Sequence, residues 1–194
     1  MRQGTMRTVA GRRLTVFEHI LLGLICAEPS SGYDLKRIFA TTPMGVYQPS
    51  SGALYPALRR LEETGLAQVQ DLSDQVARSA RRRRVYEPTP TGRADHTRWL
   101  RTPVEPATVG RDLGLHLMRF VMMEHVLPPA DVLAFLRSLA DALAAFTAQL
   151  ERYAAASDGN DQRHPRLALD HGLAVHRASL RWARKTIAQL SRSG

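Results

Sequence analysis

The hydrophobic period of the sequence changes in a fixed order between residues 14 and 100, and this order limits the possible folds. Apolar residues first recur every three or four positions, as on one face of a helix. They then alternate with polar residues, as in a half-buried strand. The pattern predicts helices over 14–27, from Ser30 or Ser31 to before Pro43, and from about Ser51 to Gly65, followed by strands over 66–70 and 84–87.

The loop between the two expected strands is unusually basic. It contains five arginines within seven positions, namely Arg78, Arg81, Arg82, Arg83 and Arg84. Guanidinium groups suit bidentate phosphate contact or entry into a narrow minor groove. Three helices followed by a two-stranded hairpin with a basic tip is the element order of a winged helix-turn-helix. A fourth helix, capped by Thr89 or Thr91, is expected to run to about Leu100.

The second half of the chain is expected to be helical throughout. A helix from Asp112 to His125 is almost entirely apolar on one side, which predicts that it is buried. Two longer stretches, over 132–153 and 169–190, repeat apolar residues in alternating steps of four and three, which is typical of a seam between helices. These stretches predict an antiparallel hairpin with apolar surface left for a second subunit to cover. The expected dimer interface comprises Leu136, Leu139, Leu143, Phe146, Leu150, Leu180 and Ile187.

The expected fold is therefore mainly α. A basic N-terminal arm spans residues 1–13, and a winged helix-turn-helix domain with a two-stranded β wing spans 14–102. A C-terminal α-helical dimerisation domain, which is also the expected place for an effector, spans 108–194.

The charge balance favours a polyanionic partner. The 194 residues include 27 Lys and Arg against 18 Asp and Glu, a net charge of +9, and the first hundred residues hold 15 of the basic groups and 9 of the acidic ones. Arg12 and Arg13 before an apolar stretch leave a twin-arginine signal as an alternative, although Glu18 and His19 interrupt that stretch. No apolar run is long enough for a membrane span, and the single cysteine fits a reducing compartment, so a cytoplasmic protein is expected.

Residues 51–66, SGALYPALRRLEETGL, resemble the recognition-helix signature of the PadR family of transcription regulators. The tetrapeptide at 32–35, GYDL, is similar to the second-helix motif of that family, and Arg84-Val85-Tyr86 with Thr89 and Gly92-Arg93 is similar to its motif after the wing. The chain departs from the family at Pro88, where an apolar residue is usual, and in its longer basic wing.

The resemblance covers residues 14–100 and implies a homodimer whose two winged helices read a palindromic operator in double-stranded DNA. It also implies repression of neighbouring genes, relieved by a small molecule or a stress signal. The alternative is a winged helix that serves as a protein interaction module, against which the arginine-rich wing argues. No catalytic constellation is present, so the chain is not expected to be an enzyme.

A winged helix places its third helix in the major groove and its wing beside the backbone or the minor groove. On that arrangement the expected DNA-binding residues are Lys36, Gln48, Ser50, Ser51, Ala53, Tyr55, Arg59 and the five wing arginines. For Tyr55 a packing and hydrogen-bonding role within the domain is an equal alternative.

The residues expected to line an apolar or aromatic effector pocket are Trp99, Met118, Met122 and Trp182, because methionine side chains repack around varied ligands. Plain core packing is the alternative for each of them. Cys26 is expected in the core, without a basic activator. The spacing of His164, His171 and His176 does not place a ligand pair on one helix face, so no metal or cofactor is expected.

Overall fold

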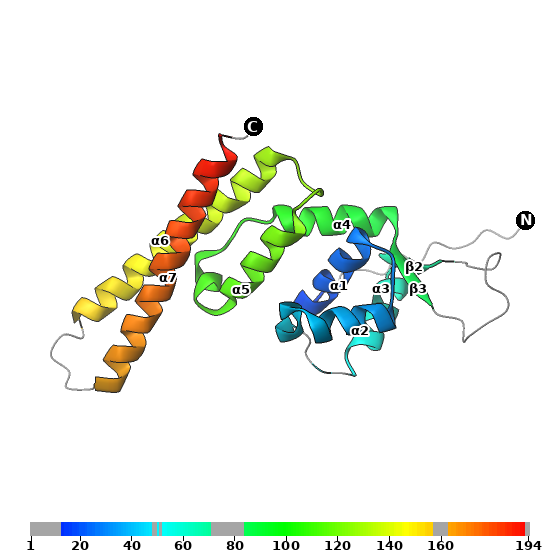
Figure 1. The fold of residues 1–194 in the computed structure, drawn as a ribbon, viewed down its shortest axis with the longest axis horizontal. Helices are drawn as coiled ribbons and strands as arrows, with labels where there is room; N and C mark the ends of the chain where they lie inside the picture. The colour runs from blue at the N-terminus through cyan, green and yellow to red at the C-terminus, as the bar shows by residue number, and fades with distance from the viewer. Residues whose placement is uncertain (1–12, 48–49, 51, 71–83, 157–162, 193–194) are drawn as a thin grey trace, which may run out of the picture. The chain divides into compact units, whose positions relative to one another are not determined.

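The computed structural model describes residues 13–47, 50, 52–70, 84–156 and 163–192. It divides into two compact units, Met1–Trp99 and Leu100–Gly194, each of which is described by itself. The first contains helices α1 to α3, a small sheet and most of α4, and the second contains α5 to α7 (Figure 1). None of the described helices combines the length and apolar character that crossing a bilayer requires.

The first unit begins with short helices, and side-chain caps set the starts of the first two. Their bounds are Val16–Ala27 for α1, Gly32–Thr41 for α2, Pro43–Tyr47 for the 3-10 helix η1 and Leu54–Glu63 for α3. Thr15 accepts a hydrogen bond from the Glu18 amide while the Glu18 carboxylate accepts one from the Thr15 amide, and Ser31 and Asp34 repeat this capping box at α2. The cap predicted at Ser30 or Ser31 therefore lies at Ser31.

The sheet of the first unit has three strands rather than the two expected. Strand β1 (Ser30–Ser31) and strand β2 (Ala67–Val69) both pair antiparallel with β3 (Val85–Pro88), which lies between them. The two serines of β1 lie between the end of α1 and the start of α2, so their backbone groups are available to β3. A two-residue strand is too short to show alternation, which explains why the sequence pattern missed it.

Helix α4 (Pro90–Arg101) starts from a tight junction with the end of α3. The Thr89 hydroxyl accepts a hydrogen bond from the Gly92 amide at 3.0 Å and donates one to the Gly65 carbonyl at 2.6 Å. A Cβ on Gly92 would lie 1.9 Å from the Leu66 carbonyl oxygen, so only glycine fits there. Thr89 is thus the cap of α4, as the sequence predicted.

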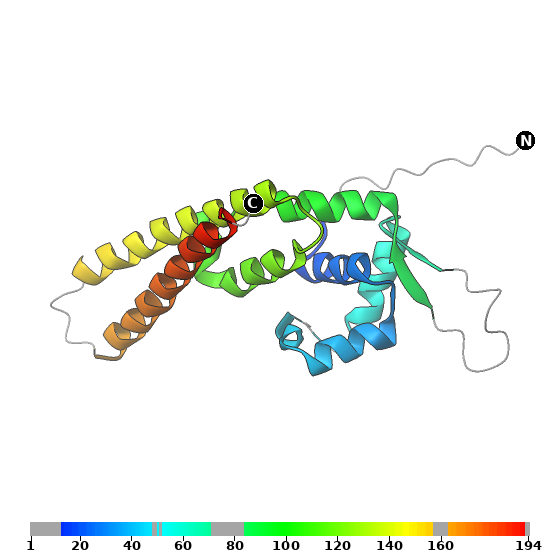
Figure 2. The same cartoon turned by 45° about the horizontal axis from the view of Figure 1, so that its top comes forward.

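The second unit consists of three helices, α5 (Pro106–Met122), α6 (Pro129–Ala156) and α7 (Arg163–Leu190). Helices α6 and α7 run side by side as an antiparallel pair, and α5 packs against α6 (Figures 1 and 2). The helical hairpin predicted from the two seams is present. Helix α5 begins at Pro106, earlier than expected, because proline fits the first turn, where its missing amide is not needed.

The expectation that the apolar side of α5 is buried holds in the single chain for Met123, at 1% exposed, but not for two other members. Leu117 is 39% exposed and Val121 is 65% exposed. The inward face instead carries Val109, His116 and Arg119, which are all buried. Two polar side chains thus occupy the position that apolar periodicity alone assigned to the solvent.

The expected interface also needs correction at three positions. Leu136, Leu139 and Leu143 are fully buried within the folded chain, where α6 packs against α5 and α7. The seam itself was predicted, but its partners are helices of the same chain. Phe146, Leu150, Leu180 and Ile187 are only partly buried.

Candidate nucleic-acid interface

Helix α3 has one buried face and one exposed face. Leu54, Ala57, Leu58 and Leu61 are at most 1% exposed and form part of the core of the first unit. On the opposite face Tyr55 is 51% exposed, and Arg59, one turn later, is also exposed. The helix therefore presents a tyrosine and an arginine to solvent from a rigidly packed base.

An ion pair between an arginine and a buried carboxylate links α3 to α1. The Arg60 Nε lies 2.5 Å from Glu18 Oε1, and the Glu18 side chain is 2% exposed. Burial raises the pKa of Glu18, but the hydrogen bonds from the Thr15 backbone, Arg60 and the Thr15 hydroxyl outweigh it and bring the pKa below its usual 4.5. The carboxylate that caps α1 thus also restrains α3. The pair leaves no local signal in the sequence, because its members lie 42 residues apart.

The Tyr55 ring lies against the first residue of α2. A Cβ on Gly32 would lie 2.5 Å from Tyr55 Cε1, and Gly32 itself is buried. The absence of a side chain on Gly32 lets the ring cross the start of α2. Tyr55 therefore has the packing role that was one of its two predicted roles, while half of its surface remains exposed for contact with a ligand.

Arg84 connects the base of the wing to the end of α3. Its Nη2 lies 2.7 Å from both carboxylate oxygens of Glu62, and its guanidinium carbon lies 5.6 Å from the centre of the Tyr86 ring. Burial raises the pKa of Tyr86, and the charges of Arg84, Glu62 and Arg59 also act on its hydroxyl. These charged groups therefore lie close together around the exposed face of α3.

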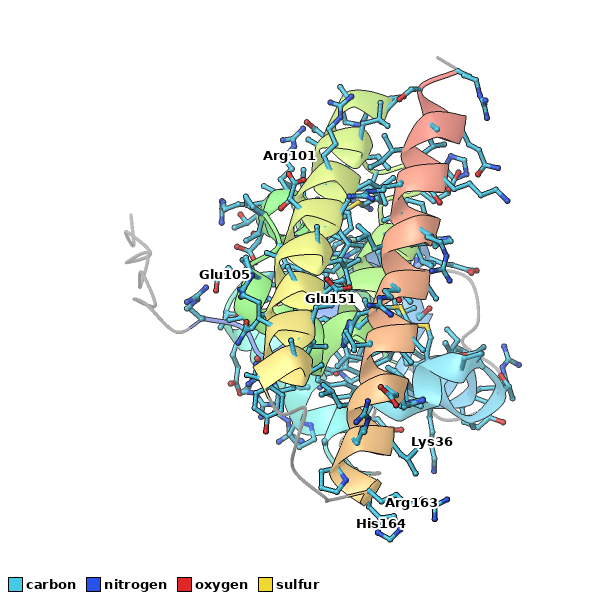
Figure 3. The ribbon with its side chains drawn as sticks, turned by 90° about the vertical axis from the view of Figure 1, so that its left-hand side faces the viewer. Lys36, Arg101, Glu105, Glu151, Arg163 and His164 are labelled. Atoms are coloured by element: carbon cyan, nitrogen blue, oxygen red, sulfur yellow. The ribbon has the colours of Figure 1, made fainter. Side chains whose placement is uncertain are left out.

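The other expected DNA-binding residues fall into two groups. Lys36 is exposed on α2 and extends away from its helix (Figure 3). Ser50 is exposed, and its carbonyl accepts a hydrogen bond from the amide of Ala53, which is half-buried and precedes α3. The remaining candidates lie outside the described residues: Gln48, Ser51, Arg78, Arg81, Arg82 and Arg83.

The expected effector residues are divided between the two units. In the first unit Trp99 stacks on the His19 ring at 4.6 Å and lies near His96, whose pKa burial lowers to about 4. In the second unit Trp182 packs edge-on against Phe120 at 5.6 Å, and both are half-buried. Met118 and Met122 are also half-buried. These residues are available for repacking, and the pocket remains a prediction.

Buried polar groups of the second unit were not predicted. Arg119 donates to the carbonyls of Leu100 and Thr102, and burial lowers its pKa to about 10. The Thr108 hydroxyl donates its only proton to the Glu105 carbonyl, so it accepts from His116 Nε2 at 2.9 Å. His116 is therefore the Nε2–H tautomer, and burial lowers its pKa. Such contacts leave no periodic signal in a sequence.

An exposed ion pair joins the two helices of the hairpin. Glu151 of α6 accepts hydrogen bonds from Nε and Nη2 of Arg177 in α7, the shorter at 2.7 Å, while Arg163 and His164 lie at the first turn of α7 (Figure 3).

Burial raises the pKa of the Cys26 thiol to about 11, so it is a poor nucleophile. Within the described part of the chain, no cluster of three potential ligands could hold a metal ion.

Comparison with known families identifies both halves of the chain. Residues 21–98 match the model of the transcriptional regulator PadR-like family. The N-terminal half of the chain is thus similar to the PadR-like family. Residues 117–191 match a second model, described as virulence activator alpha C-term. The resemblance inferred from the motifs is confirmed, and the PadR match covers α2, α3 and the sheet.

Two curated proteins similar to this chain are described as transcriptional regulators. A probable transcriptional regulator of Mycobacterium tuberculosis is 27% identical over 97 residues, half of each chain, and a second regulator of that organism is 50% identical over 48 residues, 25% of this chain and 41% of the relative. The chain thus matches half or less of the length of these relatives. PadR of Bacillus subtilis, solved with operator DNA and also with p-coumaric acid, is 17–18% identical with a TM-score of 0.41, covering 91% of this chain and 99% of that one.

Proposed function

We propose that the chain is a homodimeric repressor that binds operator DNA through α3 and the wing. The observation that carries this proposal is the exposed face of α3, where Tyr55 and Arg59 project from a helix whose opposite face is buried. In a winged helix this helix enters the major groove. There Arg59 can contact a base edge or a phosphate, and the Tyr55 hydroxyl can contact a phosphate.

The basic wing supports the same proposal. Arg84 lies at its base beside α3, and Arg78, Arg81, Arg82 and Arg83 precede it in the sequence. Phosphate contacts from these side chains release condensed counterions, so affinity falls steeply with salt. Because such contacts carry little sequence information, the wing supplies affinity and α3 supplies specificity.

A homodimer is proposed on the exposed apolar surface of the second unit. Leu117 and Val121 of α5 and Leu167 and Val175 of α7 are between 39% and 65% exposed. Large apolar side chains left exposed on packed helices favour association with another surface. The half-buried residues Phe146, Leu150, Leu180 and Ile187 remain proposed members of this interface.

Release by an effector is the third part of the proposal. An apolar or aromatic small molecule is expected to bind near the half-buried Met118, Met122 and Trp182 of the second unit, and Trp99 stays a proposed effector residue of the first unit. Binding would alter the separation of the two α3 helices in the dimer. Tryptophan fluorescence of the operator complex, titrated with p-coumaric acid and other aromatic acids, tests this directly.

The test of the proposed function is footprinting on the region upstream of the chain's own gene. Arg59→Ala is expected to abolish the footprint at protein concentrations that protect the operator with wild type. Arg184→Ala removes the same charge from an exposed position on α7 and should leave the footprint intact. If wild type protects no upstream segment and binds scrambled DNA only weakly, the winged helix is a protein interaction module instead.

A further inference from the structure

The exposed face of α3 also contains a negative charge. Tyr55, Arg59 and Glu62 are spaced by four and three residues, which places them in one row on the helix. The last member of that row is a carboxylate, whose charge opposes the approach of a phosphate. Arg84, directly before β3, reaches the same surface through its ion pair with Glu62.

Glu62 and Arg84 form an exchangeable pair. The guanidinium nitrogen is 2.7 Å from both carboxylate oxygens, yet Arg84 is 55% exposed and Glu62 is 33% exposed. An ion pair with this much access to water contributes little to stability, because water solvates either group when the pair opens. Arg84 can therefore leave Glu62 for another anion at small cost. The Glu18–Arg60 pair differs because the Glu18 carboxylate, at 2% exposed, has little access to water if the pair opens.

We propose that Glu62 is a specificity-determining residue that withholds Arg84 from non-specific phosphates. In the free protein the carboxylate neutralises Arg84, and on any duplex it repels the backbone. Arg84 exchanges Glu62 for a phosphate only when contacts of α3 with the operator bases hold the backbone against the wing. Discrimination between operator and other DNA thus comes from repulsion by Glu62 as well as from attractive contacts. This inference rests on the proposed operator binding.

The substitution Glu62→Gln isolates the charge because it keeps the size and shape of the side chain. With the carboxylate gone, Arg84 is available to any duplex. Exposed ion pairs of this kind correspond to roughly two- to five-fold in an equilibrium constant. One additional phosphate contact steepens the slope of log affinity against log salt by about 0.9.

The experiment measures fluorescence anisotropy with two labelled duplexes, the protected upstream segment and a scrambled version, over a salt series. For Glu62→Gln we expect two- to five-fold tighter binding to the scrambled duplex, a steeper salt slope and a smaller ratio of operator to scrambled affinity. In an Arg84→Gln background the same change should have no effect on the slope. Glu63→Gln removes an equal charge from the adjacent exposed residue. It should change the affinity for the scrambled duplex and the salt slope less than Glu62→Gln does.

The possible results distinguish failure of this inference from failure of the proposed operator binding. If Glu62→Gln weakens binding to both duplexes, the pair anchors the wing and the proposal is overturned. Equal effects of Glu62→Gln and Glu63→Gln, or an undiminished effect without Arg84, would show general charge repulsion and also overturn it. If wild type binds the operator but Glu62→Gln changes nothing, only this inference fails. If wild type binds neither duplex, the proposed function fails and the inference with it.

Discussion

Replacing Gly32 with alanine perturbs the candidate interface at one point. The new Cβ would lie 2.5 Å from Tyr55 Cε1 and 3.2 Å from Cζ, where ordinary carbon contacts begin near 3.4 Å. The ring must therefore move by roughly 1 Å. Because the ring is 51% exposed, it has room to move outward, and its hydroxyl moves at least as far as its inner edge.

The effect on folding should be small. Alanine lowers the conformational entropy of the unfolded chain, which stabilises by about 0.4–1 kcal/mol, while a displaced tyrosine rotamer costs about 0.5–1.5 kcal/mol. These contributions nearly cancel. A displaced hydroxyl, however, loses its hydrogen bond to a phosphate, which is worth about 1.5 kcal/mol, or roughly tenfold in affinity.

The measurements are operator binding by anisotropy and thermal unfolding by circular dichroism. Gly32→Ala and Tyr55→Phe should each weaken binding about tenfold, and the double variant should be no weaker than either. Gly172→Ala is the matched control, because a Cβ there meets no atom within 4 Å. If Gly32→Ala binds the operator as tightly as wild type, the tyrosine hydroxyl is not a DNA contact and its role is packing alone.

Three further predictions concern stability and assembly. Arg60→Met should lower the melting temperature more than Glu18→Gln does, because it leaves a buried carboxylate with fewer partners; the reverse order would contradict the role given to Arg60. His96, whose pKa burial lowers to about 4, contributes stability that is full above pH 6.5 and is lost as pH falls from 6.5 toward 4, by roughly 3 kcal/mol at most. Denaturant titrations of His96→Phe should lack this pH dependence, and an unchanged dependence would assign it elsewhere. Val121→Asp on α5 should give monomers in light scattering, whereas Val46→Asp, at an 81% exposed position of η1, should remain dimeric; a dimeric Val121→Asp variant would exclude α5 from the interface.

Local signals in the sequence predicted the first unit well. The caps at Ser31 and Thr89 follow from hydroxyl side chains just before an apolar periodic run. Gly65, predicted as the left-handed residue that ends α3, has a φ of +71°. Each of these features is determined within a few residues of chain, so a single sequence contains the information. The exposed positions of Tyr55 and Arg59 follow from the same short-range periodicity.

Features that depend on distant parts of the chain were beyond such signals. An apolar stripe shows that a helix face is covered, but not by which element, so Leu136 and Leu143 were assigned to a partner subunit although α5 and α7 cover them. Charge alone did not show that Arg84 is paired with Glu62. The polar side chains His116 and Arg119 are buried because hydrogen-bond partners from other segments meet them there.

The central position of β3 has a consequence for the length of the wing. The Gln70 amide donates to the Val85 carbonyl at 2.9 Å, next to the paired residues of β2 and β3. Backbone hydrogen bonds therefore fix both ends of the wing, at Gln70 and at Val85. A longer connection between these points adds loop-closure entropy of about 0.6 kcal/mol for a doubling of length. It leaves the register of the strands unchanged. A loop of another length or charge could therefore be grafted between Gln70 and Arg84 while the pairing of β2 with β3 is kept.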